Sequence, residues 1–361
     1  MIDIEFKVIR PEELYAEHYK LWRETKSHYK SYDMPDFLFK RILKADFLIF
    51  RNFEIQALCL KRKKQVLICA HVFFHKFNNQ IKPAIGLVVC QPDLSMEEAE
   101  FFWQSLRKIF PSQNFTGPMN GHAYLGFTIP SNNVNAKKIG FATAGSHSGL
   151  QTLWQSRELK PYRKYLSFET DLRGEFLEKI AKEIADLPEG FSVRPFRWWR
   201  AQEDINTLNE LVNQAFQDHF NFTPLNDQEN WDILKMSRWA LTKGFCTFLL
   251  KDNRPVGFCM AMLDFNQVWQ QGNSDFINLL TLIFKNKKIS RARLMHIGLL
   301  PEFRGKGLGK FLRHQVILNL VKSGVQSLES SYIDEGNINS QKNVESTGGK
   351  RLHEFYLYQT I

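Results

Sequence analysis

PEFRGKGLG, from Pro301 to Gly309, is the stretch that decides the interpretation of this chain. It follows an apolar, strand-like run at residues 292–300 and leads into a helix-like run that begins at residue 308. Its three glycines let the backbone adopt positive φ angles and approach a ligand closely. The first N–H groups of a helix lack partners within the helix, and the helix dipole favours an anion there. The stretch therefore predicts a loop that binds phosphate.

Two well-known phosphate loops do not match this stretch. The pattern GxxxxGK[ST] is absent, and a dinucleotide-binding GxGxxG loop needs another glycine spacing and a later acidic residue. What remains is Arg-x-x-Gly-x-Gly between a strand and a helix. The run from Leu299 to Gly309 resembles the pyrophosphate loop of the GNAT superfamily, the acyl-CoA-dependent N-acyltransferases. An ordinary glycine-rich turn is the alternative, but the length and context of the run favour the phosphate loop.

The order of expected elements extends this resemblance. Residues 191–361 read β-α-α-β-β-β-α-β-α-β, as in a GNAT domain, with one extra short helix at Phe276. The first half has a similar order, and 361 residues suit two domains. We therefore predict an α/β fold with two GNAT-like domains in tandem, each a mixed central sheet flanked by helices. Their expected limits are 1–172 for a degenerate N-terminal domain, 173–190 for a linker helix and 191–361 for an acyl-CoA-binding domain. An unrelated α/β domain in the first half remains the alternative.

The two halves differ at the position of the phosphate loop. In the first half the corresponding segment, Cys90–Glu98, has no glycine and carries Asp93, Glu97 and Glu98. Acids repel a pyrophosphate, so we expect the N-terminal half not to bind CoA in the usual way. Ser95 and Glu98 also form a capping-box pattern that predicts a helix to about Phe110.

The whole chain is also similar to a sparsely characterised bacterial family of GNAT-containing proteins. That similarity rests on the glycine loop and on four shorter motifs: Gly117–Asn120, Phe222–Leu225, Pro255–Phe258 and Tyr356–Tyr358.

The resemblance implies acetyl-CoA or a longer acyl-CoA as co-substrate. In GNAT enzymes the strand before the loop splays from its neighbour, and its backbone pairs with the pantetheine arm. An Asn at the start of a later helix contacts the same arm; the Ser340 position belongs to that helix motif. The implied cofactor-binding residues are Ile297, Gly298, Leu299, Arg304, Gly305, Lys306, Gly307, Leu308, Gly309, Lys310, Asn337 and Ser340. A packing role for Gly298 and a helix-capping role for Asn337 are the alternatives.

Acyl transfer to an amine needs a neutral amine, donors for the oxyanion and a proton for the departing thiolate. The Tyr that is often the acid in this superfamily is replaced by Val344 here. Tyr332 could take its place. His296, whose imidazole titrates near neutrality, and Glu329, an acid within a strand, are the candidate bases. A packed or surface histidine and a solvated strand face are the alternatives.

We expect two groups of aromatic residues to lie at particular places in the fold. Residues 220–225 and Trp231 lie near the helix connection that walls the acceptor site in GNAT proteins, or they serve helix packing. Trp198 and Trp199 are expected to pack between the two halves.

The net charge of +10 attracts anions, but the charges are scattered and dense only at Lys61–Lys64 and Lys285–Lys288. We predict an N-acyltransferase, in the first instance an N-acetyltransferase, that acts on a primary amine of a small molecule or peptide. Two alternatives remain open. One is a CoA-binding module without turnover. The other is a tRNA-linked aminoacyl or acyl transferase, which predicts RNA binding with a steep salt dependence.

The remaining features indicate a cytoplasmic, reduced protein. The five cysteines are odd in number, lie in strand-like runs and form no CxxC. The N-terminus has no leader pattern, and no uncharged apolar run approaches spanning length. HExxH is absent. His71 and His75 lie in a strand-like run, where four residues separate them by roughly 13 Å. We therefore expect no metal site. The oligomeric state stays undetermined.

Overall fold

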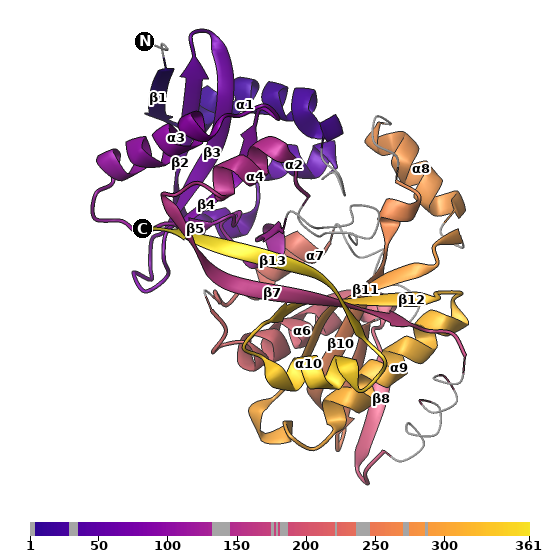
Figure 1. Cartoon of the computed structure of the whole chain (residues 1–361). Helices are drawn as coiled ribbons and strands as arrows, with labels where there is room; N and C mark the ends of the chain where they lie inside the picture. The colour runs from indigo at the N-terminus through magenta and orange to yellow at the C-terminus, as the bar shows by residue number, and fades with distance from the viewer. Residues whose placement is uncertain are drawn as a thin grey trace. The chain divides into compact units, whose positions relative to one another are not determined.

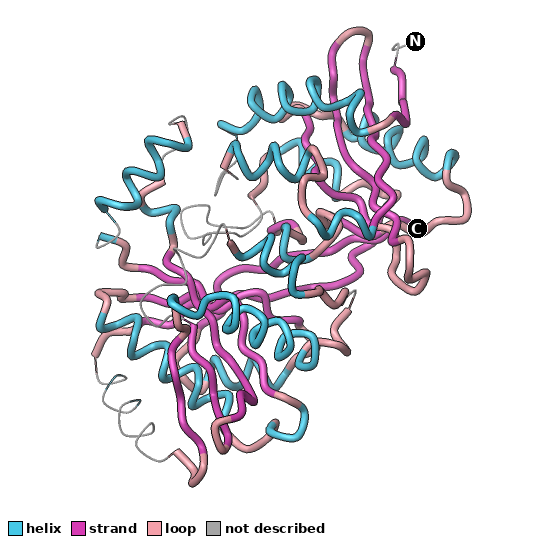
Figure 2. The backbone as a smooth tube through the Cα atoms, turned by 180° about the vertical axis from the view of Figure 1, so that it is seen from behind, coloured by secondary structure: helices cyan, strands magenta, loops and turns pink. Residues whose placement is uncertain are grey.

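The computed structural model describes residues 4–28, 35–131, 145–174, 187–220, 222–235, 246–269, 274–285 and 288–361, with residues 177 and 180. It is an α/β structure of two compact units (Figure 1, Figure 2). The N-terminal unit comprises Met1–Lys164, Gln271–Asp275 and His353–Ile361. The C-terminal unit comprises Tyr165–Gln270 and Phe276–Leu352.

The N-terminal unit is a sheet covered by helices. Its strands follow the order β1-β2-β3-β4-β5-β13; β1 to β4 are antiparallel to one another, and β4 and β5 are parallel. The elements are β1 Ile4–Ile9, α1 Pro11–Thr25, α2 Asp36–Leu43, β2 Phe53–Arg62, β3 Gln65–His75, β4 Ala84–Cys90, α3 Met96–Ile109, β5 Thr116–Gly117, β6 Ile129–Pro130 and α4 Ser148–Trp154. Phe102, Trp103 and Trp154 are fully buried in its core. The predicted capping box is confirmed: Ser95 Oγ accepts a hydrogen bond from the Glu98 amide at 3.2 Å.

The C-terminal unit repeats this plan. Its strand order is β7-β12-β11-β10-β9-β8, and only β11 and β12 run parallel among its described pairs. The elements are β8 Phe191–Pro195, α6 Ala201–Ala215, α7 Asp227–Leu234, β9 Cys246–Lys251, β10 Arg254–Leu263, α8 Asp275–Lys285, β11 Arg291–Leu299, α9 Leu308–Lys322, β12 Ser327–Asp334 and α10 Ile338–Glu345. Leu312, Val316 and Leu320 of α9 are fully buried and form one apolar stripe of this helix.

Each unit is completed by the closing strand of the other half of the chain. Residues 165–171 of β7 (Leu159–Asp171) pair with β12 in the C-terminal unit. The end of β13 (Lys350–Thr360) pairs with β5 and β6 in the N-terminal unit. The predicted limits 1–172 and 191–361 follow the chain and do not include this exchange, because strand pairing is a long-range contact.

Most of the predicted linker helix at 173–190 falls outside the described residues. The sequence interpretation missed α4, because its polar and small residues Ser148 and Gly149 resemble a loop. Here His147 caps the helix, and its Nδ1 accepts from the Leu150 amide.

Candidate functional site

The parallel strands β11 and β12 separate part of the way along. Their ladder runs from Arg291 opposite Ser327 to Leu294 opposite Ser330, and both strands are described beyond it. On its other side β11 stays paired with β10 as far as Leu299. The register with β10 skips Met295, which is therefore a β-bulge. A bulge bends its strand, so the backbone of residues 295–299 turns away from β12 and leaves an opening between the strands.

The glycine loop lies directly after the separated part of β11. Gly305 and Gly307 both have φ of 76°. A Cβ at either position would meet no atom within 4 Å, so the backbone conformation, not crowding, favours glycine there. Gly309 does not share the positive φ expected for it, because it already lies within α9.

Helix α9 begins without a side-chain cap. Gly307 occupies the N-cap position in a left-handed conformation, and it has no side chain to accept from the first amides. The N-terminus of a fifteen-residue helix thus keeps donors and a positive dipole end for an anion. Lys306 is exposed beside this terminus, and Lys310 lies in the first turn.

Arg304 holds the loop against its neighbours. Its Nε donates to the Leu299 carbonyl at 3.2 Å, and its Nη2 donates to the Ala215 carbonyl at 2.9 Å. These bonds join the loop to the end of β11 and to the last residue of α6. Gly298 is fixed by packing, since a Cβ there would lie 2.7 Å from the Phe258 ring and 3.0 Å from Ala215 Cβ.

Two of the three predicted catalytic residues lie beside the opening. His296 comes from the separated part of β11, and its half-buried ring lies 6.1 Å from the Phe216 ring. Tyr332 comes from β12, beyond the last ladder pair. The Arg293 guanidinium lies 4.8 Å from the Tyr332 ring centre, and the Tyr165 ring lies 6.3 Å away.

Glu329 lies elsewhere, within the ladder and opposite Arg293. Its side chain is fully buried, and Arg291 Nη2 donates to its carboxylate at 2.7 Å. Arg291 also lies 3.3 Å from Asp264 and 3.8 Å from Glu169. The carboxylate is therefore part of a buried ion-pair cluster.

This cluster connects to Tyr332 through Ser331. The Ser331 hydroxyl donates to Glu329 at 3.1 Å, and Arg293 Nε lies 2.9 Å from the same hydroxyl as donor. Because Arg293 also lies over the Tyr332 ring, Glu329 helps to fix the position of that phenol.

Asn337 and Val344, the two positions of the α10 motif that the sequence singled out, both have structural roles. Asn337 is the N-cap, and its Oδ1 accepts from the Ser340 amide at 3.1 Å. Val344, where the superfamily often has Tyr, is 5% exposed and packs with Leu166 and Phe168 of β7. A phenol at this position would be in the core.

The sequence interpretation missed His219. Its ring lies 4.8 Å from Phe216, the residue that also contacts His296. Partial burial lowers the pKa of His219, and the nearby Arg304 cation lowers it further, although Asp334 and Asp218 oppose this. This environment therefore favours the neutral imidazole. The available signal was its place just before the aromatic stretch at 220–225.

The predicted acceptor-wall segment is tied to α6. Asn213 Nδ2 donates to the Leu225 carbonyl at 2.8 Å, and its Oδ1 accepts from the Leu225 amide at 3.2 Å. Asn209 donates to the same carbonyl at 2.9 Å. Leu225 is buried, which agrees with a packing role for this end of the segment.

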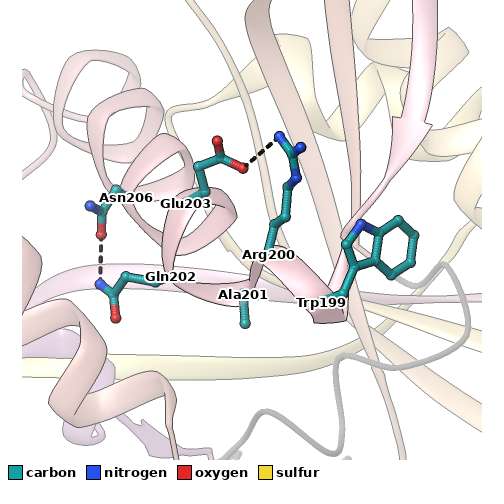
Figure 3. Close-up of a pocket in the computed structure, with 6 residues that line it drawn as sticks. All are labelled: Trp199, Arg200, Ala201, Gln202, Glu203 and Asn206. Carbon is teal, nitrogen blue, oxygen red and sulfur yellow. Dashed lines mark hydrogen bonds and ion pairs between the residues drawn. The ribbon is translucent and has the colours of Figure 1, made fainter.

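A shallow hollow lies at the opposite end of α6 (Figure 3). It is lined by Trp199, Arg200, Ala201, Gln202, Glu203 and Asn206. Arg200 pairs with Glu203 at 3.4 Å (Figure 3). Trp199 is 80% exposed within this hollow. Nine residues of helix, about 14 Å, separate Asn206 in this hollow from Ala215 beside the glycine loop.

The N-terminal unit has a similar strand separation, but its own chain fills it. β4 and β5 pair only at Ala84 and Thr116. Beyond that point the Met119 amide donates to the Ile85 carbonyl at 2.8 Å, and Asn120 Oδ1 accepts from the Leu87 amide at 2.7 Å. A Cβ on Gly86 would lie 2.2 Å from the Met119 carbonyl oxygen, so the turn contacts the strand directly.

Residues 205–348 match the model of the acetyltransferase (GNAT) family. Two curated relatives are a bacterial ceramide synthase of Caulobacter vibrioides and a mycothiol acetyltransferase of Kytococcus sedentarius. The first is 20% identical over 202 residues, covering 54% of this chain and 53% of the relative. The second is 26% identical over 195 residues, covering 54% and 55%. The chain thus spans about half the length of the curated relatives it matches.

Solved structures agree on the fold. A tandem GNAT protein from the clavulanic acid biosynthesis pathway has a TM-score of 0.57 at 11% identity, covering 99% of this chain and 98% of that one. A GCN5-related glucosamine N-acetyltransferase region of a fungal β-N-acetylglucosaminidase has a TM-score of 0.54 at 12% identity, covering 99% and 38%. None of the helices among the described residues is long and apolar enough to cross a membrane.

Proposed function

We propose that the C-terminal unit binds acyl-CoA, since residues 205–348 match the GNAT family model and the chain has the fold of a tandem GNAT protein. The unit then transfers the acyl group to a primary amine. The observation that carries this proposal is the strand opening of β11 and β12 beside a glycine loop that ends in an uncapped helix.

In this proposal the backbone of Ile297, Gly298 and Leu299 pairs with the pantetheine arm. The amides of residues 305–309 bind the pyrophosphate, and Lys306 and Lys310 neutralise its charge. Arg304 acts differently from the lysines, because its guanidinium already binds two carbonyls and shapes the loop. Asn337 and Ser340 would border the arm from the start of α10.

The reaction requires two proton transfers. The amine nitrogen attacks the thioester carbonyl, the C–S bond breaks, the amine loses a proton and the thiolate gains one. We propose Tyr332 as the proton donor, since it lies on the β12 side of the opening and Val344 is a core residue. His296 or His219 would accept the amine proton, because both lie around Phe216 near the opening.

The N-terminal unit would bind no acyl-CoA in this proposal. The Met119–Asn120 turn already forms hydrogen bonds with β4 at the position where a pantetheine arm would pair.

Thermal unfolding with acetyl-CoA and with longer acyl-CoAs tests the site. A ligand that binds only the folded state raises the melting temperature. Gly307→Glu places a carboxylate at the phosphate site and should abolish the shift. Gly324→Glu is the matched control, because Gly324 also has positive φ and open space but follows the other end of α9. Loss of the shift in both variants, or no shift in the wild type, would contradict the proposal.

Turnover is tested by the release of free CoA thiol with a panel of amines. The panel includes lipid-like and water-soluble amines, because one relative is named a ceramide synthase and another a mycothiol acetyltransferase. Binding without thiol release would favour the second candidate, a CoA-binding module, which the loss of Tyr at Val344 suggests. RNA retention that weakens steeply with salt would instead support the tRNA-linked alternative.

A further inference from the structure

Helix α8, Asp275–Lys285, exposes large apolar side chains. It lies in the connection between β10 and β11 (Figure 1). Phe276 is 69% exposed and Phe284 79% exposed, and Ile277, Leu279 and Leu280 are exposed as well. Such a concentration of exposed apolar residues in eleven positions is typical of an interaction site.

The five exposed residues share one side of the helix. At 100° per residue, positions 276, 277, 279, 280 and 284 fall within an arc of about 160°. Asn278 and Leu282 lie on the opposite side and are buried. The helix is therefore anchored by its narrower side and presents its apolar side to the surroundings, the reverse of an ordinary surface helix.

After the first residue of this helix, Asp275, the charges in the following sequence are all positive as far as Glu302. The sequence contains no Asp or Glu between Asp275 and Glu302. Lys285 ends the helix, Lys287 and Lys288 follow in the sequence, and the Lys288 side chain is exposed. An apolar helix side that is followed in the sequence by several lysines is the pattern of a helix that lies in the interface of an anionic membrane. Eleven residues are too few to span a bilayer.

We propose that α8 docks the protein on the surface of a membrane that contains anionic lipids. The apolar side enters the boundary between headgroups and acyl chains, and the exposed Lys288 contacts the lipid phosphates. A second copy of the chain or a protein partner could also cover an apolar surface, but the run of lysines without acids complements a phosphate-rich surface. The inference is independent of the proposed acyl transfer.

Sedimentation of the full-length chain with lipid vesicles tests this docking. We expect binding to vesicles of phosphatidylcholine and phosphatidylglycerol, and much weaker binding to phosphatidylcholine alone. Phe276→Gln/Phe284→Gln should reduce the partition coefficient at least tenfold, because two aromatic side chains no longer enter the lipid. Lys285→Gln/Lys288→Gln should remove most of the preference for the anionic vesicles and of its salt dependence.

Phe77→Gln is the matched control, since Phe77 is 77% exposed in the N-terminal unit, outside α8. It should bind vesicles like the wild type. Because the altered apolar residues and Lys288 are exposed, the melting temperature and its acyl-CoA shift should persist in every variant, which separates this test from that of the proposed function. If the Phe276/Phe284 variant fails to fold, Leu279→Gln/Leu280→Gln takes its place.

Three outcomes would overturn the inference. The first is no binding of the wild type to anionic vesicles at low salt. The second is equal binding by the wild type and the Phe276/Phe284 variant. The third is a wild-type dimer in the absence of lipid that this variant converts to a monomer, which would assign the surface to a second copy.

Discussion

The side-chain oxygen of Asn120 accepts a hydrogen bond from the Leu87 amide at 2.7 Å, in the middle of β4. Leu87 has a φ of 49°, a conformation that non-glycine residues rarely adopt. In the C-terminal unit the ladder between β11 and β12 ends at Leu294, and the remaining part of β11 keeps only β10 as its strand partner among the described residues. The two halves therefore share a strand separation, and the chain itself fills one of them.

Asn120→Ala should destabilise the protein by about 1–3 kcal/mol, because the buried Leu87 amide loses its acceptor. Denaturant unfolding measures this change. The number of acetyl-CoA molecules bound per chain should stay the same, as judged by calorimetry. Asn78→Ala is the control, since Asn78 accepts a similar bond from the Gln80 amide at an exposed turn and should change stability little. A second acetyl-CoA site in Asn120→Ala would show that the turn alone blocks the N-terminal unit.

Tyr332→Phe should lower kcat by about 100-fold and leave the KM for acyl-CoA nearly unchanged, because only the proton donor is lost. The Phe ring keeps the contact with the Arg293 guanidinium, so the fold should be retained. Steady-state release of CoA thiol gives both constants. Tyr165→Phe, which removes a hydroxyl from the neighbouring ring, is the control. Equal kcat in wild type and Tyr332→Phe would exclude Tyr332 as the acid.

Glu329→Gln should cost about 2–4 kcal/mol of stability, because Arg291 loses the closest carboxylate of a buried cluster. The activity that remains should keep the wild-type pH profile, since this residue positions Tyr332 through Ser331 and Arg293 without reaching the opening. Thermal unfolding and kcat/KM against pH measure the two effects. Loss of the ascending limb of the profile would instead identify Glu329 as the general base.

For comparison, Glu17→Gln removes a partly exposed ion pair with Lys61 and should cost less than about 1 kcal/mol.

Stability should fall as the pH drops from 7 to 5, because two buried histidines resist protonation. The ring centres of His18 and His71 lie 5.2 Å apart, and both residues are fully buried. Burial lowers the pKa of His71 to about 3 and lowers that of His18 well below its usual value, with the neighbouring His71 adding to the effect. The unfolded chain binds these protons from about pH 6.5 downward, whereas the folded chain does not, so protons favour unfolding in this range.

His71→Gln isolates one of these contributions. Between pH 7.5 and pH 5, each buried histidine lowers the free energy of unfolding of the wild type by about 2 kcal/mol. In His71→Gln the decrease over the same pH range should therefore be about 2 kcal/mol smaller. Urea unfolding at the two pH values measures it. An identical pH dependence in both proteins would mean that His71 titrates normally in the folded state.

Local sequence signals predicted the elements near the site. The run from Leu299 to Gly309 indicated strand, loop and helix, and the structure has β11, the turn with Gly305 and Gly307, and α9 in that order. The Ser95–Glu98 capping box was equally readable. These features depend on residues a few positions apart, whose backbone preferences and hydrogen bonds are set within the segment.

The tertiary structure decided what these residues meet. The sequence alone predicted a phosphate-binding type of loop and the order of the elements around it, and it showed Val344 at the position where the superfamily often has Tyr. It did not place Val344 in the core against β7, put Glu329 among buried arginines, bring His219 near His296, or fill the β4 opening with Asn120. The sequence also did not predict that β7 pairs in the C-terminal unit and β13 in the N-terminal unit. Each of these joins residues far apart along the chain, and such contacts form only when sheets and helices pack, so no local pattern encodes them.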